Sequence, residues 1–303
     1  MEINQLKELF RKFDSKISYN EDLKKKSWFN IGGKAKVFYK PSELKDLIRF
    51  LKVLNNKEKI HIIGAGSNTL ITDEVFDGVV IKLGKNFNRI SFLTPEIIVS
   101  GAAVPDKKLA EFAADNGLSG FEFLSCIPGT VGGGIKMNAG CFENEIKDIL
   151  LSVQVIDKIG NVSSIPSNKI NFKYRTNNLS EDFIFLSASF KGKKQDSKNI
   201  LKIMKDFKIR KDNNQPTKIK TSGSTFKNPI DKTKKKVWEL IKDSIPSNIS
   251  FGDACISEKH SNFFVNRGNA RFSDMKKLID YVEKSVFEKT GIKIEKEIKI
   301  LEN

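Results

Sequence analysis

The sequence predicts an α+β protein, and three observations lead to this fold class. Amphipathic helical patterns and short apolar strand patterns follow one another without a regular repeat along the 303 residues. Two stretches, residues 64–68 and 127–140, are rich in glycine, which is typical of backbone that must approach a ligand closely. Residues 292–300 alternate apolar and charged side chains with the period of a strand.

The first half of the chain combines helices with short strands. Helices are expected within residues 1–13, 42–55 and 105–116, and strands over 37–39, 60–63, 79–83 and 97–100. The strand that leads into the first glycine stretch would suit a dinucleotide-binding βαβ unit. That fold is rejected, because the third glycine of its fingerprint is missing and residues 69–83 are β-branched and broken by turns.

The second half continues with strands and then becomes helical. Strands are expected over 153–156, 162–165 and 184–190. A lysine-rich helix over 197–211 is expected to open a second region, because the strand-dense sequence stops there. Two more helices, over 235–243 and 273–289, precede the alternating strand of residues 292–300.

The longer glycine stretch is predicted to be a loop. Glycine loses more backbone entropy on folding than other residues, so residues 127–140 are too rich in it for a helix or a central strand. Their N–H groups, unshielded by side chains, can converge on an anion such as a diphosphate. Since residues 64–68 have the same character, the two stretches are expected to hold one extended ligand. The alternative is that the glycines only permit tight turns.

The net charge of +16 raises the possibility of nucleic-acid binding. The lysines are spread along the chain, however, and neither a zinc-finger spacing nor the aromatic signature of an RNA-binding sheet accompanies them. An anionic small-molecule substrate uses the same charge. Nucleic acid is therefore not an expected partner.

The cysteine content and the N-terminus predict a cytoplasmic protein without a membrane segment. Cys126, Cys141 and Cys255 have no zinc-binding or CxxC spacing, which fits a reducing compartment, and no metal site is expected. A reactive thiol beside the glycine stretch is a weaker interpretation, because no His or Lys cluster surrounds it in sequence. No run of eighteen apolar residues is present, and the N-terminal pattern lacks the apolar core of a signal peptide.

Several motifs occur in an order that points to one family. They are Ser-Trp-Phe-x-Ile-Gly-Gly from Ser27, Gly-Ala-Gly-Ser-Asn from Gly64, Ile-Pro-Gly-Thr-Val-Gly-Gly from Ile127, Met-Asn-Ala-Gly from Met137, Tyr174-Arg175, Gly-Ser-x-Phe-Lys-Asn-Pro from Gly223, Ser-Glu-Lys-His-x-Asn-Phe from Ser257, and Ile-Glu-x-Glu-Ile from Ile294. Together they closely resemble the UDP-N-acetylenolpyruvoylglucosamine reductase family of peptidoglycan synthesis. The short distance from Arg175 to the next strand resembles the shorter subgroup, which lacks an extra tyrosine-bearing loop.

The resemblance implies a fold, domains and cofactors. It implies an FAD-binding module of the vanillyl-alcohol-oxidase (PCMH) type over residues 1–195, with subdomains of about 1–63 and 64–195. A smaller α+β substrate-binding domain would follow over 196–291, and a C-terminal strand, 292–303, would return to the flavin. Non-covalent FAD is the expected cofactor and NADPH the expected co-substrate. A monomer is expected.

The same resemblance assigns residues to the cofactor and the substrate. Those matched to FAD binding are Gly64, Ala65, Gly66, Ser67, Asn68, Gly101, Ala102, Ile127, Pro128, Gly129, Thr130, Gly132, Gly133, Asn138 and Gly140. Those matched to the substrate pocket are Lys227, Asn228, His260 and Asn262. His260 can equally be a structural hydrogen-bonding residue.

Three residues match the catalytic positions of the family. The resemblance implies that NADPH passes a hydride to flavin N5, and that the reduced flavin passes it to the enol ether of UDP-N-acetylglucosamine enolpyruvate, which yields UDP-N-acetylmuramate. Arg175 would bind the substrate carboxylate, Ser224 would protonate the carbanion, and Glu297 is the second matched glutamate. From the residues alone, Arg175 could be a surface arginine, Ser224 a turn hydroxyl and Glu297 part of a solvated strand edge.

The sequence departs from the family pattern at three positions. Lys296 replaces the proline of Leu-Glu-Pro-Glu, Asn177 replaces a serine after Tyr-Arg, and Cys126 precedes the long glycine stretch. The oxidases that share the FAD module are the rival interpretation. They often attach flavin through His or Cys, and neither His61 nor His260 has a matching context.

Overall fold

The computed structural model describes residues 1–11, 13, 16–216, 219–246 and 248–303. The described chain forms two compact units. Unit 1 contains residues 1–19, 37–65 and 78–211, and unit 2 contains residues 20–36, 66–77 and 212–303. Segments 20–36 and 66–77 thus group with the C-terminal residues rather than with the N-terminal module in which the sequence analysis placed them.

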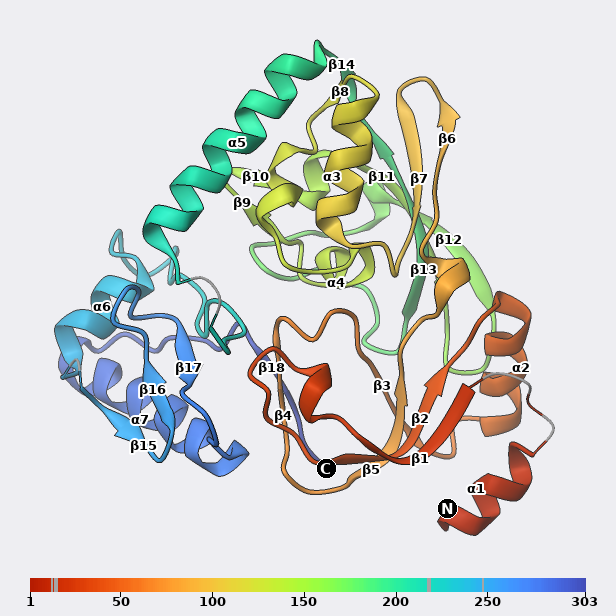
Figure 1. The fold of residues 1–303 in the computed structure, drawn as a ribbon, viewed down its shortest axis with the longest axis horizontal. Helices are drawn as coiled ribbons and strands as arrows, with labels where there is room; N and C mark the ends of the chain where they lie inside the picture. The colour runs from red at the N-terminus through yellow and green to blue at the C-terminus, as the bar shows by residue number, and fades with distance from the viewer. Residues whose placement is uncertain (12, 14–15, 217–218, 247) are drawn as a thin grey trace. The chain divides into compact units, whose positions relative to one another are not determined.

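The larger sheet of unit 1 has five antiparallel strands in the order β12-β11-β13-β7-β6. The strands are β6 (Ile90–Thr94), β7 (Ile97–Gly101), β11 (Leu150–Ile156), β12 (Val162–Pro166) and β13 (Ile184–Lys191). Helices α3 (Asp106–Asp115) and α4 (Val131–Lys136) lie beside this sheet (Figure 1). Apolar side chains from the helices and the strands, among them Leu109, Val131, Val153 and Phe190, form one buried core.

A second sheet, whose residues belong mostly to unit 1, has the strand order β1-β2-β5-β3. Its strands are β1 (Lys16–Asp22), β2 (Lys34–Lys40), β5 (Phe76–Ile81) and β3 (Lys59–Ile62). Helices α1 (Ile3–Leu9) and α2 (Leu44–Leu54) pack against it through a core that contains stacked Phe10, Phe50 and Tyr39 rings. Strand β3 pairs in parallel with β5 and delivers the chain into Gly64.

Short hairpins and one long helix complete unit 1. The two-stranded pairs are β8 (Leu118–Ser119) with β14 (Lys193–Lys194) and β9 (Gly140–Cys141) with β10 (Asn144–Glu145). Helix α5 (Ser197–Asn214) belongs to unit 1 as far as Lys211, because Met204 and Phe207 pack against the core of the larger sheet. The boundary between the two compact units therefore lies after Lys211, near the end of α5, rather than at residue 196 before this helix.

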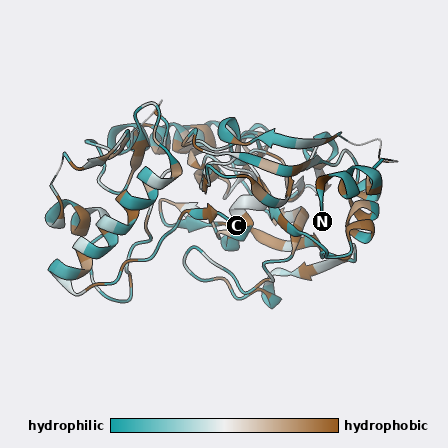
Figure 2. Cartoon of the chain, turned by 90° about the horizontal axis from the view of Figure 1, so that it is seen from below, coloured by the Kyte–Doolittle hydropathy of each residue, from teal (hydrophilic) through white to brown (hydrophobic). Residues whose placement is uncertain are grey.

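Unit 2 is built on a small sheet and two helices. Strands β15 (Ser250–Phe251), β16 (Ala254–Ile256) and β17 (Phe264–Asn266) are antiparallel, and helices α6 (Val237–Ser244) and α7 (Phe272–Thr290) lie beside them (Figure 1). The core includes Leu240, Phe264, Leu278 and Val282. Along most helices of the molecule, hydrophilic and hydrophobic residues intersperse (Figure 2), as expected of elements that bury one face.

The predicted strand over residues 292–300 is wrong in extent. Only β18 (Lys299–Leu301) is a strand, and it pairs in parallel with β4 (Thr69–Ile71). The alternating pattern nevertheless marks burial, since Ile294 and Ile298 are 1% and 3% exposed. Packing into the core of unit 2, rather than a continuous ladder, explains the alternation.

No helix among the described residues is long and apolar enough to cross a membrane. Within the same residues, no group of three or more His, Cys, Asp or Glu side chains is arranged to hold a metal ion.

Candidate active site

The prediction that the long glycine stretch contains no helix is wrong. Helix α4 spans Val131–Lys136 and includes Gly132, Gly133 and Gly134. A Cβ atom on Gly132 would lie 3.0 Å from Ala102 Cβ, and one on Gly134 would lie 2.6 Å from Ile146 Cδ1. Glycine costs about 1 kcal/mol relative to alanine in a helix. At Gly132 and Gly134, the close contacts with Ala102 and Ile146 disfavour alanine and so offset this cost, whereas Gly133 has space for a Cβ atom.

Backbone hydrogen bonds fix the start of this helix against the strand end that precedes α3. The amides of Val131 and Gly132 donate to the carbonyls of Val104 and Ala102, both at 2.9 Å, and the Asp106 amide donates to Gly129 O at 3.2 Å. These bonds do not use the amides of Gly129, Thr130 and Gly133. The predicted cofactor residues Gly101 and Ala102 belong to this support, since their own amides donate to Arg89 O and Leu186 O.

Gly64, at the start of the first glycine stretch, lies against Thr130 of the second within unit 1. A Cβ atom on Gly64 would lie 2.6 Å from Thr130 Oγ1, so only glycine allows this approach. Gly66 has a φ of +70°, and a Cβ atom there would lie 1.8 Å from Lys26 O. Ala65, Ser67, Ile127 and Gly129 are partly exposed, and Pro128 and Gly133 are exposed. Bare backbone next to accessible amides is what a diphosphate requires, so these residues fit FAD.

The side chain of Asn138 holds the end of the glycine stretch to neighbouring segments of the chain by hydrogen bonds. It is fully buried with a φ of +40°, and its Nδ2 donates to Glu145 Oε2 at 3.0 Å and to Lys173 O at 3.1 Å. Its Oδ1 accepts from the Lys147 amide at 3.1 Å. The side chain predicted to bind cofactor is therefore engaged with protein groups. Glu145, which sequence reasoning missed, carries no motif that would have signalled this role.

Arg175 is held in a defined orientation rather than solvated. Its Nη2 donates to Gly140 O at 2.8 Å and its Nη1 to Asn138 O at 3.5 Å, and its side chain is only 17% exposed. Glu145 Oε1 lies 3.9 Å from Nη1. The backbone of Arg175 has a φ of +56°, a left-handed conformation that is uncommon for a residue other than glycine. Such strain is typical of functional positions.

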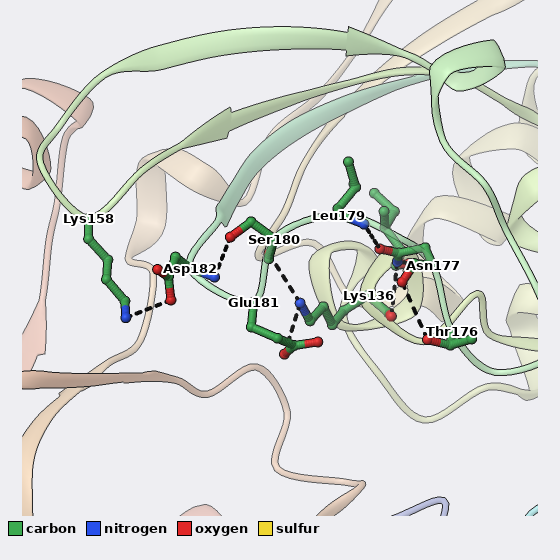
Figure 3. A network of polar contacts seen from close by, with 9 residues as sticks. Lys136, Lys158, Thr176, Asn177, Leu179, Ser180, Glu181 and Asp182 are labelled. Carbon is green, nitrogen blue, oxygen red and sulfur yellow. Dashed lines mark hydrogen bonds and ion pairs between the residues drawn. The ribbon is translucent and has the colours of Figure 1, made fainter.

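Asn177 ties the segment after Arg175 to helix α4. Its Nδ2 donates to Ile135 O at 2.9 Å and to Lys136 O at 3.0 Å, which satisfies carbonyls at the end of the helix. Figure 3 shows this contact together with the ion pair between Lys136 and Glu181 at 3.0 Å. The departure from the family serine thus gives Arg175 a firmly anchored neighbour.

Ser224 and Glu297 lie on neighbouring segments of unit 2. The Glu297 amide donates to Thr225 O and the Lys227 amide to Glu295 O, both at 2.8 Å. Asn68 Nδ2 donates to Glu297 O at 3.1 Å, and the Lys299 amide donates to Asn68 O at 2.9 Å. Glu297 is partly buried, whereas Glu295 and Lys299 are exposed. Glu297 is therefore distinct from a solvated strand edge.

The residues matched to the substrate pocket divide into two kinds. Asn262 is 3% exposed and supports the Ser224 segment, because its Oδ1 accepts from the Phe226 amide and its Nδ2 donates to Phe226 O. His260 Nδ1 accepts from the Asn262 amide at 3.2 Å, and burial lowers the pKa of its imidazole. The hydrogen bonds of Asn262 and His260 to the local backbone favour a structural role for both side chains.

Lys227 and Asn228 have polar side chains nearer the surface. Lys227 Nζ lies 3.6 Å from Glu295 Oε2, and its side chain is 24% exposed. Asn228 is partly buried, and its Oδ1 accepts from the Val237 amide at 3.0 Å.

Cys141, which follows the glycine stretch, is not an activated thiol. Burial raises the pKa of the Cys141 thiol to about 12, and its Sγ donates to Phe123 O at 3.2 Å. Cys126 is buried. The interpretation of a reactive thiol is therefore not supported.

Comparisons with known proteins agree with this geometry. A family model described as an FAD binding domain matches residues 35–165, and one described as the C-terminal domain of UDP-N-acetylenolpyruvoylglucosamine reductase matches residues 215–301. The predicted fold class, an FAD module of the PCMH type followed by a smaller α+β domain, is confirmed.

Full-length relatives carry the same name. The protein named UDP-N-acetylenolpyruvoylglucosamine reductase from Pelagibacter ubique is 62% identical over 99% of this chain and 100% of its own length. The one from Rickettsia typhi is 44% identical over 95% of this chain and 96% of its own length. The crystal structure of the reductase from Thermus caldophilus superposes with a TM-score of 0.81 at 29% identity, over 95% of this chain and 99% of that one. The chain therefore belongs to the UDP-N-acetylenolpyruvoylglucosamine reductase family.

Proposed function

We propose that this chain reduces UDP-N-acetylglucosamine enolpyruvate to UDP-N-acetylmuramate, with Arg175, Ser224 and Glu297 as the catalytic residues. FAD and NADPH are the cofactor and co-substrate of the family, and the reaction belongs to peptidoglycan precursor synthesis. The observation that carries the residue assignment is the bond from the Glu297 amide to Thr225 O at 2.8 Å, because it fixes the glutamate beside the segment that bears Ser224.

FAD is held, in this proposal, by residues 64–68 and 127–134. The close approach of Gly64 to Thr130 supports this assignment, as do the amides of Gly129, Thr130 and Gly133, which donate no hydrogen bond among the described residues. When bound, the flavin supplies the chemistry that the side chains lack, since it accepts a hydride from NADPH and delivers one to the enol ether.

Arg175 binds the carboxylate of the enolpyruvyl group. Hydride addition places negative charge on the carbon next to that carboxylate, so a fixed cation stabilises the developing charge. The carbonyls of Gly140 and Asn138 fix the guanidinium, which then needs little reorganisation when substrate arrives. A lysine cannot hold this planar geometry.

Ser224 donates the proton that completes the reduction. A serine hydroxyl is a weak acid, yet a carbanion is basic enough to take its proton within hydrogen-bond reach. The Thr225 amide donates to Asn262 O at 2.8 Å, and the Thr225 carbonyl accepts from the Glu297 amide, so two hydrogen bonds hold the residue that follows Ser224. Glu297 is the second proton-handling group and assists the serine.

The reaction itself provides the test of the proposed function. The purified protein is incubated anaerobically with NADPH and UDP-N-acetylglucosamine enolpyruvate, and the product is analysed by mass spectrometry. We expect the substrate to gain two hydrogen atoms in step with NADPH oxidation. NADPH oxidation that requires oxygen and leaves the substrate unchanged would instead support the oxidase alternative.

The location and assembly of the enzyme complete the proposal. A cytoplasmic monomer is proposed, because NADPH and nucleotide sugars are cytoplasmic metabolites. Size-exclusion chromatography with light scattering tests the monomer, and a mass that is twice that of the chain would contradict it.

A further inference from the structure

Asp106, the first residue of α3, is a buried acid that the proposed chemistry does not use. Its side chain is 0% exposed, and neither carboxyl oxygen has a hydrogen-bond partner among the residues that the structure describes. Buried polar groups in proteins are nearly always hydrogen-bonded. A carboxyl group that is both fully buried and unpartnered therefore needs a physical explanation.

The carboxyl group lies between two parts of the long glycine stretch. A Cβ atom on Gly129 would lie 2.5 Å from Asp106 Oδ2, and one on Gly134 would lie 3.4 Å from Oδ1. The carboxyl group therefore requires glycine at position 129, whereas at position 134 it lies at ordinary van der Waals distance. The Asp106 amide also donates to Gly129 O, and Pro105 forms a bridge with Thr130. Asp106 contacts the proposed FAD loop through its backbone and its side chain.

Among the described residues, no basic side chain forms an ion pair with this acid, and burial is the one cause of its pKa shift. Several charged side chains of the neighbouring elements pair with one another: Lys107 with Glu111, Lys136 with Glu181, and Lys147 with Glu145. Lys108 and Asp115, the other charged residues of α3, are exposed. Burial alone raises the pKa of Asp106 to about 8. A helix N-terminus would favour the ionised form, so desolvation outweighs the helix dipole here.

We propose that Asp106 is a positioning residue for the FAD loop, that it acts as a neutral carboxylic acid, and that its ionisation releases the loop and weakens FAD binding. Two effects act in the same direction. A carboxylate between Gly129 and Gly134 would have to draw in water, which opens the packing of the loop. Its negative charge would also oppose the anionic diphosphate that the neighbouring amides are proposed to hold.

The inference rests on the proposed role of residues 127–134 in holding FAD, and the test separates the two. Apoprotein is titrated with FAD by flavin fluorescence from about pH 7 to about pH 9.5, for the wild type and for Asp106→Asn, which keeps the shape and cannot ionise. Asp115→Asn, an exposed acid in the same helix, is the matched control. In the wild type and the control, we expect the Kd for FAD to rise by about tenfold across this range. In Asp106→Asn it should stay nearly constant.

Lysine side chains also lose their charge in this pH range, but they do so in all three proteins. Their effect therefore cancels when the Kd of each variant is divided by that of the wild type at the same pH. Equal pH dependence in the wild type and Asp106→Asn would overturn the inference while leaving the proposed function intact. A wild-type protein that binds no FAD at any pH would overturn the proposed function itself.

A second measurement covers the case in which Asp106→Asn does not fold. Infrared difference spectra of the wild type with isotopically labelled aspartate should show a protonated carboxyl group at about pH 7 that disappears by about pH 9.5. A spectrum with every aspartate ionised at pH 7 would contradict the inference.

Discussion

At the scale of the residue, Arg175, the proposed ligand of the substrate carboxylate, has the most constrained side chain of the proposed catalytic residues. Its guanidinium is oriented by two backbone carbonyls, Gly140 O and Asn138 O, and its backbone adopts a left-handed conformation. Such an arrangement presents a planar cation with little freedom to rotate. Charge without this geometry would stabilise the transition state poorly.

The substitution Arg175→Lys tests this geometry while it preserves the charge. We expect kcat for the reduction of the enolpyruvate to fall by about two to three orders of magnitude, as when a preorganised donor is lost. Reduction of the bound flavin by NADPH should change little. Arg89→Lys, an exposed arginine of unit 1, serves as the control in the same stopped-flow measurement. Equal losses in both half-reactions would assign Arg175 a purely structural role.

At the scale of the element, the segment that carries Glu297 explains how Lys296 is tolerated. The bridge between Phe226 and Lys296 uses the amides of Lys227 and Glu297, and not that of Lys296. The position therefore accepts proline, which the family pattern has there, without the loss of a backbone hydrogen bond of this bridge. In this chain, Lys296 Nζ instead forms an ion pair with Glu283 of α7 at 2.9 Å.

Two proline substitutions test this account of the segment. Lys296→Pro should fold and keep activity within about twofold of the wild type, with a loss of stability below about 1 kcal/mol from the ion pair. Lys299→Pro removes the amide that donates to Asn68 O, so it should cost about 1–3 kcal/mol. Urea denaturation measures both. A larger loss for Lys296→Pro than for Lys299→Pro would show that the bridge is not what holds Glu297.

The elements also show what could be predicted from the sequence. Helices α2, α3 and α7 could be predicted because their apolar periodicity is local. Helix α4 could not, since the contacts that make its glycines necessary come from Ala102 and Ile146, which are distant in sequence. Likewise, alternating apolar residues indicate which side chains are buried but not whether the backbone pairs, so most of the predicted C-terminal strand is irregular.

In the candidate site too, the sequence indicates the residues that lie in motifs but not those whose role depends on tertiary contacts. The motifs match Arg175, Ser224 and Glu297 to the proposed catalytic positions, and hydrogen bonds hold the chain at or next to each of them. No motif could have identified Glu145, because its role depends on contacts with Asn138 and Arg175 that only the folded chain creates. Asp106 was missed for a similar reason, since its burial follows from packing.

At the scale of the whole molecule, the chain combines an FAD module with the C-terminal domain of its family. The comparisons establish this organisation, and both glycine stretches keep backbone that can approach a cofactor. Neither histidine of the chain occurs in a context that matches covalent attachment of flavin. Non-covalent binding of FAD is therefore the expectation for the intact protein.

Denaturation of the purified yellow protein tests this expectation. After heat or acid treatment and centrifugation, the flavin absorbance should appear in the supernatant. Flavin that remains in the precipitate would indicate a covalent bond and support the oxidase alternative.

The central claim, that Ser224 protonates the carbanion, is tested most directly by stopped-flow absorbance of the two half-reactions in Ser224→Ala. Reduction by NADPH should keep nearly the wild-type rate, because it does not use the serine. Anaerobic reoxidation by the enolpyruvate should slow by about two to four orders of magnitude, the usual contribution of a positioned acid. Substrate affinity should change little.

Ser222→Ala is the matched control, since Ser222 is 3% exposed and its hydroxyl has no hydrogen-bond partner among the described residues. It should leave both half-reactions nearly unchanged. If Ser224→Ala instead slows the two half-reactions equally, the serine only maintains the loop, the account is contradicted, and Glu297 becomes the proton donor to examine.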